Sequence, residues 1–490
     1  MVLKVYDTQS GSKRPFETLE QGKVKMYVCG VTPYSRCHLG HARCYVAWDV
    51  VYRYLSYAGY EVTYVRNFTD VDDKIINRAN ERGIDPMALA EENIQTFYED
   101  MDALGIARPQ HEPRVSTTIE GIIDLVKQLE ERGLAYNVDG DVYYSVEGFA
   151  EYGKLSGRTL DSMMAGARVE VDERKRNPMD FALWKSAKPG EPKWESPWGE
   201  GRPGWHIECS AMSMSHLGDT LDIHCGGRDL IFPHHENEIA QSEGATGKKY
   251  VGVWMHNGFI NIDEQKMSKS LGNVFNVNDI IQRYEALVLR FFLATGTHYR
   301  NPINFSDAML DEAAARVAYF YETLRKAEEF LETAHGQHEG PLPHQDFIFG
   351  LEAKFREAMD DDFHLVKAMD PIGEAFKILN ELASTRKQKK MAAAAASARA
   401  LMDVIEDIDE VLNLFGEDPE SYLLRHRDHA AARHGITAEW VEEQISARVA
   451  ARVARDWEEA DRIRGALDSA GVILMDRDHG TDWMVADIRG

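Results

Sequence analysis

A strand–helix–strand pattern near the N-terminus constrains the fold of this 490-residue chain more than any other feature. The stretch KVKMYVCG at 23–30 is typical of a short strand, and after a loop an apolar run at helical spacing continues until Gly59. The stretch EVTYVRNFTD at 61–70 is rich in β-branched and aromatic residues and predicts a second strand. This order predicts a βαβ unit, which begins a Rossmann-like, doubly wound parallel sheet. Ligands in such folds bind beyond the carboxyl ends of the strands, which for the first strand means near Cys29 and His38.

The remaining pattern predicts an α/β protein with an insertion, a helical bundle and a small α+β domain at the C-terminus. A charged segment rich in tryptophan and proline interrupts the sheet pattern, helical spacing dominates from 311 onward, and a polar break at 415–437 precedes a last helix and hairpin. The predicted regions are 1–114 and 204–255 for the two halves of the sheet domain, 115–203 for the insertion, 256–310 for a loop-bearing connection, 311–415 for the bundle and 416–490 for the C-terminal domain.

Composition indicates a cytoplasmic, soluble protein. Hydrophobic residues make up 44% and charged residues 28% of the chain. No stretch approaches the ~20 apolar residues that cross a bilayer, so no membrane partner is expected. The N-terminus lacks the apolar core of a signal peptide. Five cysteines in a chain of this length favour a reducing compartment and roles in metal binding or chemistry. The net charge of −25 opposes nonspecific nucleic-acid binding but allows a local basic face.

The segment from Gly204 to Glu238 contains candidate metal ligands. Cys209 begins an apolar helical run, and His234 and Glu238 follow at a spacing that places both on one face of a helix. Thiolate, imidazole and carboxylate groups are all zinc ligands. From these residues alone, a zinc site and a capped surface helix beside an inert buried cysteine both remain open.

Two further motifs are suited to binding a nucleotide. His38-Leu39-Gly40-His41 lies where the first loop becomes a helix, so its imidazoles and the helix N-terminus can face phosphates. Lys266-Met267-Ser268-Lys269-Ser270 places two lysines on a loop that can close over a triphosphate and stabilise developing negative charge. The plainer interpretations are a capped turn and an ordinary solvated lysine loop, but both motifs in this order are very unlikely by chance.

Together these motifs resemble the two signature sequences of class I aminoacyl-tRNA synthetases. Several longer phrases resemble the cysteinyl-tRNA synthetase family in particular, and they extend over nearly the whole chain. They are CGVTPY (29–34), NFTDVDDKII (67–76), YGKLSGR (152–158), FALWK (181–185), GRPGWHIECSAM (201–212), FPHHENEIAQSE (232–243) and THYRNPINFS (297–306).

The resemblance implies a ligase that activates L-cysteine with ATP and Mg²⁺ and transfers it to tRNA(Cys). It implies one zinc ion per chain, which selects cysteine over serine by coordinating the thiolate, and the ligands Cys29, Cys209, His234 and Glu238. Cys225 stands where the family more usually has glycine, and we expect it to be tolerated. A monomer is expected.

The resemblance also assigns roles to other residues. The expected catalytic residues are His38, His41, Lys266 and Lys269, and these four together with Gly40, Gly227 and Asp229 are expected to bind ATP. The residues expected to frame the amino acid are Gly30, Thr32, Thr69, Trp205 and His224.

The C-terminal region is expected to recognise the anticodon. Arg448, Arg452 and Arg455 lie at helical spacing, which suits contacts with phosphates and unstacked bases. A solvated helix face offset by nearby acids is an equally good interpretation for each residue.

Two other protein classes share part of this pattern. A synthetase-like ligase that joins cysteine to a glucosaminyl-inositol would share the zinc site and both signatures but not the region 438–490. A non-catalytic RNA-binding relative would be expected to lose the signatures, which are intact here. A lysine-dependent persulfide activity, reported for family members with a K-I-I-K phrase, is in doubt because Asn77 follows Lys74-Ile75-Ile76.

Overall fold

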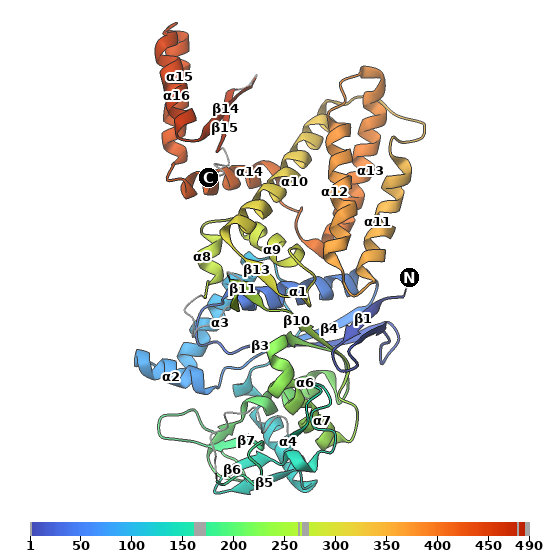
Figure 1. Cartoon of the computed structure of the whole chain (residues 1–490), viewed down its shortest axis with the longest axis vertical. Coiled ribbons are helices and arrows are strands. Elements are labelled where there is room, and N and C mark those ends of the chain that lie inside the picture. The colour runs from blue at the N-terminus through green and yellow to red at the C-terminus, as the bar shows by residue number, and fades with distance from the viewer. Residues whose placement is uncertain (1, 161–172, 263–264, 267–273, 478–479, 486–490) are drawn as a thin grey trace.

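The computed structural model describes residues 2–160, 173–262, 265–266, 274–477 and 480–485. At its centre lies a four-stranded parallel sheet with the strand order β10-β9-β3-β4 (Figure 1). Its strands are β3 (Lys23–Val31), β4 (Glu61–Phe68), β9 (Leu221–Gly227) and β10 (Val251–Asn257). The predicted α/β class is therefore confirmed.

The order of the strands places a ligand crevice at the ends of β3 and β9. From β3 the chain first adds β4 on one side and later adds β9 and β10 on the other. In doubly wound sheets the crevice opens where the strand order reverses, outside the carboxyl ends of the strands. Cys29 in β3 and Gly227 in β9 lie at this point.

Helices cover both faces of the sheet. On the face toward the helical bundle lies α1 (Leu39–Tyr57), and on the face toward the insertion lie α6 (Trp205–Leu217) and α7 (Glu236–Thr246) (Figure 1). After β4 the chain forms α2 (Asp73–Arg82) and α3 (Pro86–Ala103). A left-handed Gly83 ends α2, and Asp85 caps α3 in front of Pro86, which are ordinary stop and start signals.

The insertion contains a second sheet, which is antiparallel. Its strands pair in the order β5-β6-β7-β8. Their bounds are Ala135–Val138, Asp141–Tyr144, Phe181–Ser186 and Gly201–Pro203. The Asp139-Gly140 turn, with both φ angles positive, is a sequence signal for a hairpin that our prediction overlooked. Next to this sheet, α4 (Ile119–Glu131) packs on α6 and α7 through an apolar cluster that includes Ile122 and Met212.

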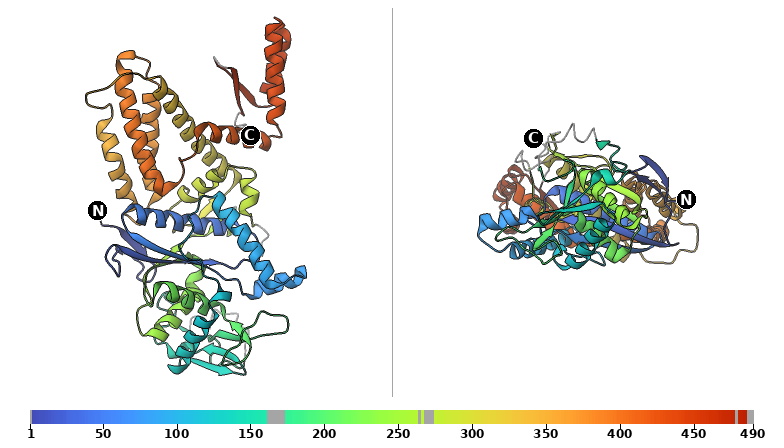
Figure 2. Two further views of the ribbon diagram at one scale, coloured as in Figure 1. Left: turned by 180° about the vertical axis from the view of Figure 1, so that it is seen from behind. Right: turned by 90° about the horizontal axis from the view of Figure 1, so that it is seen from below.

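The upper half of the molecule is mostly helical (Figures 1 and 2). A three-stranded sheet, in the order β12-β11-β13, leads into it. The strands are β11 (Ile260–Ile262), β12 (Gln265–Lys266) and β13 (Ile303–Phe305), and the helices are α8 (Val277–Ile281), α9 (Ala286–Thr295), α10 (Asp307–Thr333), α11 (Gln345–Met359), α12 (Leu365–Ala383) and α13 (Gln388–Leu412). At the N-terminus, a hairpin of β1 (Lys4–Asp7) and β2 (Ser12–Pro15) lies beside β10.

The expected polar break at 415–437 is wrong, because α14 (Pro419–Arg433) occupies most of it. Asp418 caps this helix, Pro419 begins it, and Tyr422 and Ala431 are buried. Because so few positions of α14 are buried, its sequence has no clear apolar stripe. Next come α15 (Ala438–Val453), α16 (Trp457–Ser469) and the hairpin of β14 (Val472–Arg477) and β15 (Gly480–Val485). Residues 478–479 at the predicted hairpin turn lie outside the described residues.

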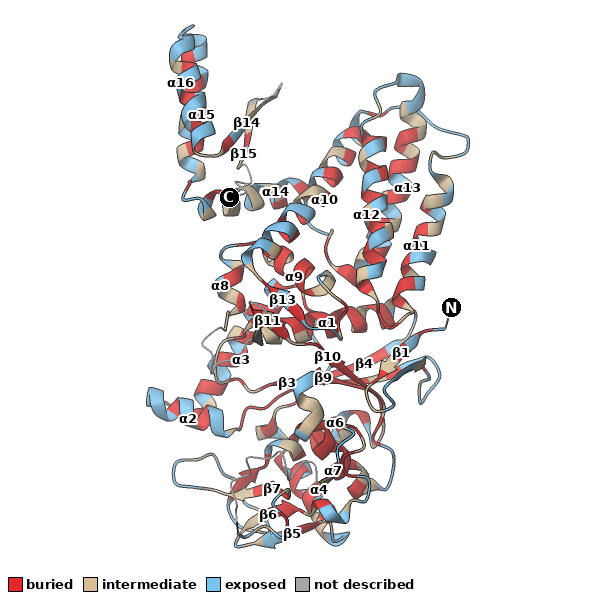
Figure 3. Ribbon diagram, viewed as in Figure 1, coloured by how far each residue is buried: buried red, intermediate tan, exposed pale blue. Residues whose placement is uncertain are grey.

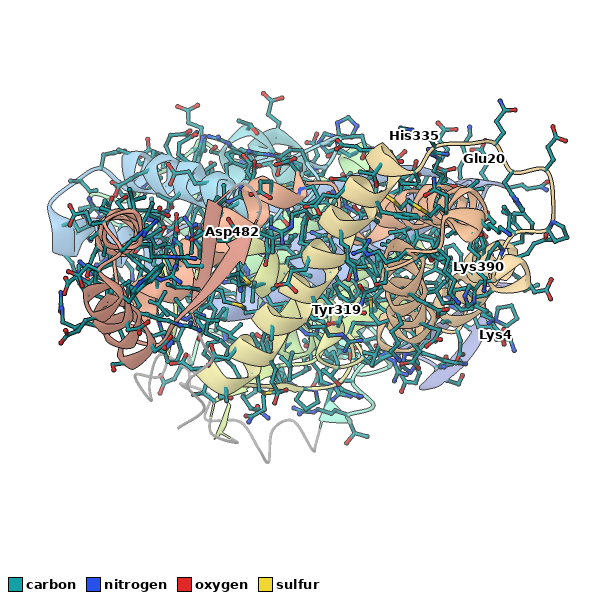
Figure 4. The ribbon with its side chains drawn as sticks, turned by 90° about the horizontal axis from the view of Figure 1, so that it is seen from above. Lys4, Glu20, Tyr319, His335, Lys390 and Asp482 are labelled. Carbon is teal, nitrogen blue, oxygen red and sulfur yellow. The ribbon has the colours of Figure 1, made fainter. Side chains whose placement is uncertain are left out.

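The C-terminal unit is more exposed than the sheet domain (Figure 3). Seen from above, α10 with Tyr319 lies between the C-terminal hairpin, where Asp482 is labelled, and the α12–α13 side, where Lys390 is labelled (Figure 4). Among the described residues, no helix has both the length and the apolar character needed to cross a bilayer.

Candidate active site and metal centre

Four potential metal ligands meet at the crevice end of the sheet. They are Cys29 of β3, Cys209 of α6, His234 of the short helix η4 (Ile231–His235) and Glu238 in the first turn of α7. Their ligand atoms all lie within 4.8 Å of one another, and all four side chains are buried. The chain thus brings together residues separated by more than 200 positions in sequence.

The separations between these atoms suit a tetrahedral ion. The two Sγ atoms are 4.0 Å apart, Cys29 Sγ is 3.7 Å from Glu238 Oε1, and His234 Nε2 is 3.0 Å from the same oxygen. Zinc bonds of about 2.0–2.3 Å give tetrahedral edges of roughly 3.3–3.8 Å. Two thiols, one imidazole and one carboxylate are also a suitable zinc donor set, so the residues present fit this metal.

A close backbone approach places Cys29 at this point. The Gly30 N–H donates a 2.8 Å hydrogen bond to Asn67 Oδ1, and a Cβ at Gly30 would lie 1.5 Å from the Asn67 carbonyl oxygen. Only glycine fits there. Asn67 Oδ1 is also 3.8 Å from Cys209 Sγ, so this amide contacts both sides of the cluster.

A second layer of side chains orients the four candidate ligands. His224 Nε2 lies 2.8 Å from Glu238 Oε2, and the Tyr250 hydroxyl donates to the same oxygen at 3.2 Å. His206 Nδ1 is 2.9 Å from His234 Nδ1. Such partners fix the orientation of metal ligands and tune their basicity.

Cys29 and Glu238 also belong to an overlapping set with two other histidines. Its remaining members are His224 and His235. His235 Nε2 lies 3.3 Å from Cys29 Sγ, and its Nδ1 lies 2.8 Å from His256 Nε2. Because His224 already contacts Glu238 and His235 already contacts His256, we assign these two histidines to the support of the ligands rather than to a second ion.

The electrostatics of the cluster favour a cation. The hydrogen bond from Cys29 lowers the pKa of Cys209 to about 6, against the effect of burial. Burial lowers the pKa of His234, but the charges of Glu238 and Cys209 outweigh burial and raise it to about 10. Burial raises the pKa of Glu238, and His224 and His234 outweigh it, so this pKa falls well below its usual value. Burial and the neighbouring Cys209 raise the pKa of Cys29 well above its usual range, so the cluster holds protons on Cys29 and His234 that a metal ion can replace.

A cavity of about 360 Å³ opens directly in front of Cys29. Gly30, Thr32 and Trp205, all predicted to frame the amino acid, line it. The Trp205 ring also stacks on His234, with ring centroids 4.4 Å apart. The predicted nucleotide-binding residues that also line this cavity are His38, Gly40, His41, Gly227 and Asp229. One cavity therefore joins the candidate metal ligand Cys29 to most of the predicted nucleotide-binding residues.

The two signature histidines cap α1 on the wall of this cavity. His38 Nδ1 accepts a hydrogen bond from the Gly40 N–H at 3.1 Å, and His41 Nδ1 accepts one from the His38 N–H at 3.4 Å. The rings are stacked with centroids 3.7 Å apart. Because both Nδ1 atoms accept, each ring in its neutral form has its proton on Nε2, where it can be donated to an anion.

Two residues predicted to contact the amino acid do not line the cavity. Thr69 is buried, and its Oγ1 accepts a 3.2 Å hydrogen bond from Asn67 Nδ2. His224 is completely buried behind Glu238. Direct contact with the amino acid stays a prediction for both residues, and in the structure Thr69 contacts Asn67 and His224 contacts Glu238. Cys225 is buried in the apolar core and belongs to neither candidate metal set of the described residues.

Only the first residue of the lysine motif belongs to the described part of the chain. Lys266 is in β12, which pairs with β11, and Lys269 lies outside the described residues. Beyond the motif, the Leu39 N–H donates to the Phe275 carbonyl and the Val277 N–H donates to the Cys37 carbonyl, both at 2.9 Å. These backbone hydrogen bonds join the segment after the motif to the turn that contains His38.

The three predicted RNA-binding arginines do not form one exposed helical face. Arg448 is only 6% exposed. Arg452 is exposed near the end of α15, and Arg455, with φ +58°, lies beyond the end of the helix at Val453. Asp456 caps α16 immediately afterwards, so the chain turns before a further helical turn can form.

Comparisons with known proteins identify the family. The family model described as "tRNA synthetases class I (C) catalytic domain" matches residues 15–315. The chain is 52% identical over 487 residues to the cysteine–tRNA ligase of Syntrophotalea carbinolica and 51% identical over 487 residues to that of Geobacter sulfurreducens. These alignments cover 99% of this chain and 99% and 100% of the relatives, respectively. The chain belongs to the cysteine–tRNA ligase family. The predicted family and enzyme class are confirmed.

Solved structures of other class I synthetases share the fold of this family member. A methionyl-tRNA synthetase of Mycobacterium tuberculosis, solved with methionyl-adenylate, has a TM-score of 0.59 at 18% identity, with 80% of this chain and 92% of the other covered. A leucyl-tRNA synthetase of Agrobacterium radiobacter, solved in a ternary complex with tRNA, has a TM-score of 0.59 at 12% identity, with 83% and 86% covered.

Sequence reasoning missed several residues of the site. Tyr34, Lys74 and Asn257 also line the cavity, and Asn67 contacts both Gly30 and Cys209. The signal for Asn67 was its place at the carboxyl end of the second strand. Nothing in the local sequence distinguished the other three.

Proposed function

We propose that this chain activates L-cysteine with ATP and transfers it to tRNA(Cys), as the names of its relatives indicate for those proteins. The observation that carries the proposal is the opening of one cavity onto both Cys29 and the His38–His41 turn. A sulfur-rich metal candidate next to a phosphate-binding turn suits a reaction that joins a thiol-bearing amino acid to a nucleotide.

A metal is needed because cysteine and serine have similar shapes. Packing alone separates such analogues by about 1–3 kcal/mol. A 10⁴-fold preference requires roughly 5.5 kcal/mol. Zinc held by Cys29, Cys209, His234 and Glu238 would supply a Lewis acid that prefers thiolate over hydroxyl and lowers the pKa of the substrate thiol.

The protein's own residues would orient the reactants and stabilise charge. Gly30, Thr32 and Trp205 frame the amino acid, and Gly227 and Asp229 hold the ribose of ATP. The cysteine carboxylate attacks the α-phosphorus, pyrophosphate leaves, and a terminal adenosine hydroxyl of the RNA then attacks the mixed anhydride. His38 and His41 donate from Nε2 to the phosphates, while Lys266 and Lys269 balance their charge, as does Mg²⁺.

We also propose a role for each region of the chain in this reaction. Residues 1–114 and 204–255 form the catalytic domain, 115–203 the insertion, 256–310 the connection with the lysine motif, 311–415 the bundle and 416–490 the anticodon-recognition domain, in a cytoplasmic monomer. The ligase that uses an amino sugar would lack the region after 438, whereas the cysteine–tRNA ligases align with this chain along 99% of its length. This region therefore favours an RNA substrate.

Cysteine-dependent exchange between ATP and pyrophosphate tests the proposal, with zinc analysis of the same sample. We expect about one zinc per chain, exchange with cysteine, and at least about 10⁴-fold less exchange with serine. Charging of tRNA(Cys) but not of glucosaminyl-inositol is expected. Equal exchange with both amino acids, or charging of the amino sugar, would contradict the proposal.

A further inference from the structure

A second cavity lies between the insertion and the catalytic sheet. Its volume is about 300 Å³, and Trp205 lines both this cavity and the one in front of Cys29. Its walls come from β7 and β8 of the insertion and from the beginnings of α2 and α6. It is therefore a side chamber next to the proposed adenylate site.

Glu208 in the wall of this chamber has an unsatisfied oxygen. The side chain is 1% exposed, and its Oε2 has no hydrogen-bond partner within the described part of the chain. A buried carboxyl oxygen without a partner is costly, and native proteins contain few of them. Glu208 therefore indicates a ligand that donates a hydrogen bond.

Other acidic groups of the chamber already have partners. Asp180 accepts hydrogen bonds from the Tyr136 hydroxyl at 2.6 Å and from the Val146 N–H at 3.0 Å. Asp73 is paired with Lys185, whose Nζ lies 2.9 Å from Oδ2, and also with Arg202. Glu208 is therefore the acceptor that a ligand can satisfy.

The same contacts argue against a metal ion. Three cations, Lys175, Lys185 and Arg202, line the chamber next to its acids, and the candidate metal sets of the described residues do not include Glu208. A wall of mixed charge with one buried oxygen that lacks a partner suits a nucleotide instead, because an exposed cation such as Lys185 can face a phosphate while Glu208 accepts from an exocyclic amine.

We propose that this chamber binds the cytosine that precedes the terminal adenosine of the tRNA, with Glu208 accepting a hydrogen bond from the exocyclic amine. The inference rests on the proposed function, since the terminal adenosine must reach the adenylate in the first cavity. Trp205 then stands between the two bases. Lys185, whose side chain is 37% exposed, lies where it can face the connecting phosphate.

The test compares tRNA(Cys) transcripts with cytidine or uridine at this one position, because uracil has a carbonyl in place of the amine. In the unaltered protein we expect cytidine to be preferred about 10- to 100-fold in kcat/KM. In Glu208→Leu, which removes the acceptor and keeps an apolar volume, the preference should fall to near unity. Glu208→Gln, which keeps an amide oxygen, should restore part of it.

Glu195→Leu is the matched control, because it removes the same charge from an exposed position in the insertion and should keep the full preference. If Glu208→Leu does not fold, as judged by its melting temperature, Glu208→Met replaces it. No preference in the unaltered protein, or a preference that persists in the folded apolar variants, would overturn the proposal. Failure of the proposed function is distinguishable from either result, because cysteine-dependent pyrophosphate exchange involves no tRNA.

Discussion

The metal candidates and the C-terminal arginines differ in how firmly the fold holds them. Cys29, Cys209 and Glu238 are buried at the end of a parallel sheet. The order of the strands and the contact of His224 with Glu238 fix their positions. Arg452 and Arg455 lie on an exposed helix end and in the turn beyond it. One region is organised before any ligand binds, whereas the other presents charge on long side chains.

This difference determines how each region should respond to mutation. Removing one group from a buried, mutually charged cluster leaves its neighbours uncompensated, so the effect is large. Removing an exposed arginine from a phosphate contact removes one of several similar charges, so the effect is small and depends on salt.

The largest effect is expected for Cys209→Ala. Loss of one partner from a buried charge cluster costs about 3–5 kcal/mol, which is roughly 10²- to 5 × 10³-fold in zinc affinity. Zinc content after dialysis and cysteine-dependent pyrophosphate exchange should both fall. Cys37→Ala is the control, since Cys37 is equally buried but lies outside the cluster. Equal zinc retention by the two variants would contradict the assignment.

The next largest effect is expected for His38→Asn. Asparagine can still cap α1, so the melting temperature should change little. The Nε2 donor is lost, and removal of one such donor costs about 10²- to 10³-fold in kcat. Steady-state pyrophosphate exchange measures this, with the KM for cysteine as the internal control. A rise in that KM with kcat unchanged would mean that His38 only supports the amino acid.

A smaller effect is expected for His224→Phe, which preserves the stacking on Trp254 but removes the partner of Glu238 Oε2. Loss of such a partner typically weakens metal binding about 10- to 100-fold. Competition with a chelator measures this affinity. The exposed His111→Phe serves as the control. A zinc affinity equal to that of the control would show that His224 does not support the metal ligands.

The smallest effect is expected for Arg452→Ala, with Arg448→Ala for comparison. If Arg452 contacts a phosphate, its loss should reduce the slope of log binding against log salt for tRNA by about one. Arg448 is buried, so its variant should instead lower the unfolding temperature of the C-terminal unit. A salt slope unchanged in Arg452→Ala would remove this residue from the interface.

The family resemblance, rather than any spacing, supplied the four candidate metal ligands, and the structure brings their ligand atoms within 4.8 Å of one another. From the residues themselves, only the one-turn spacing of His234 and Glu238 and the place of Cys29 at a strand end could be predicted. The His38 turn was predictable for the same reason, since it follows the first strand. Sites formed by residues close in sequence, or fixed at the end of a strand, can therefore be predicted from the sequence.

Other features depended on tertiary contacts that no spacing reveals. His224 was expected to contact the substrate, and in the structure it contacts Glu238 instead of lining the cavity. The alternation of side chains along β9 could not show this, because both faces of the strand are buried. The helix α14 was missed because only a few of its positions are buried. Arg455 was placed on a helix that ends two residues before it, because Asp456 caps the next one.

X-ray absorption at the zinc edge tests the central claim most directly, because it counts the sulfur atoms bound to the metal. We predict two sulfur ligands in the free protein, from Cys29 and Cys209, and a third when L-cysteine is added but not when L-serine is added. A sulfur count that stays the same at saturating cysteine, or active protein without zinc, would contradict the assignment of the cluster as the site that selects cysteine.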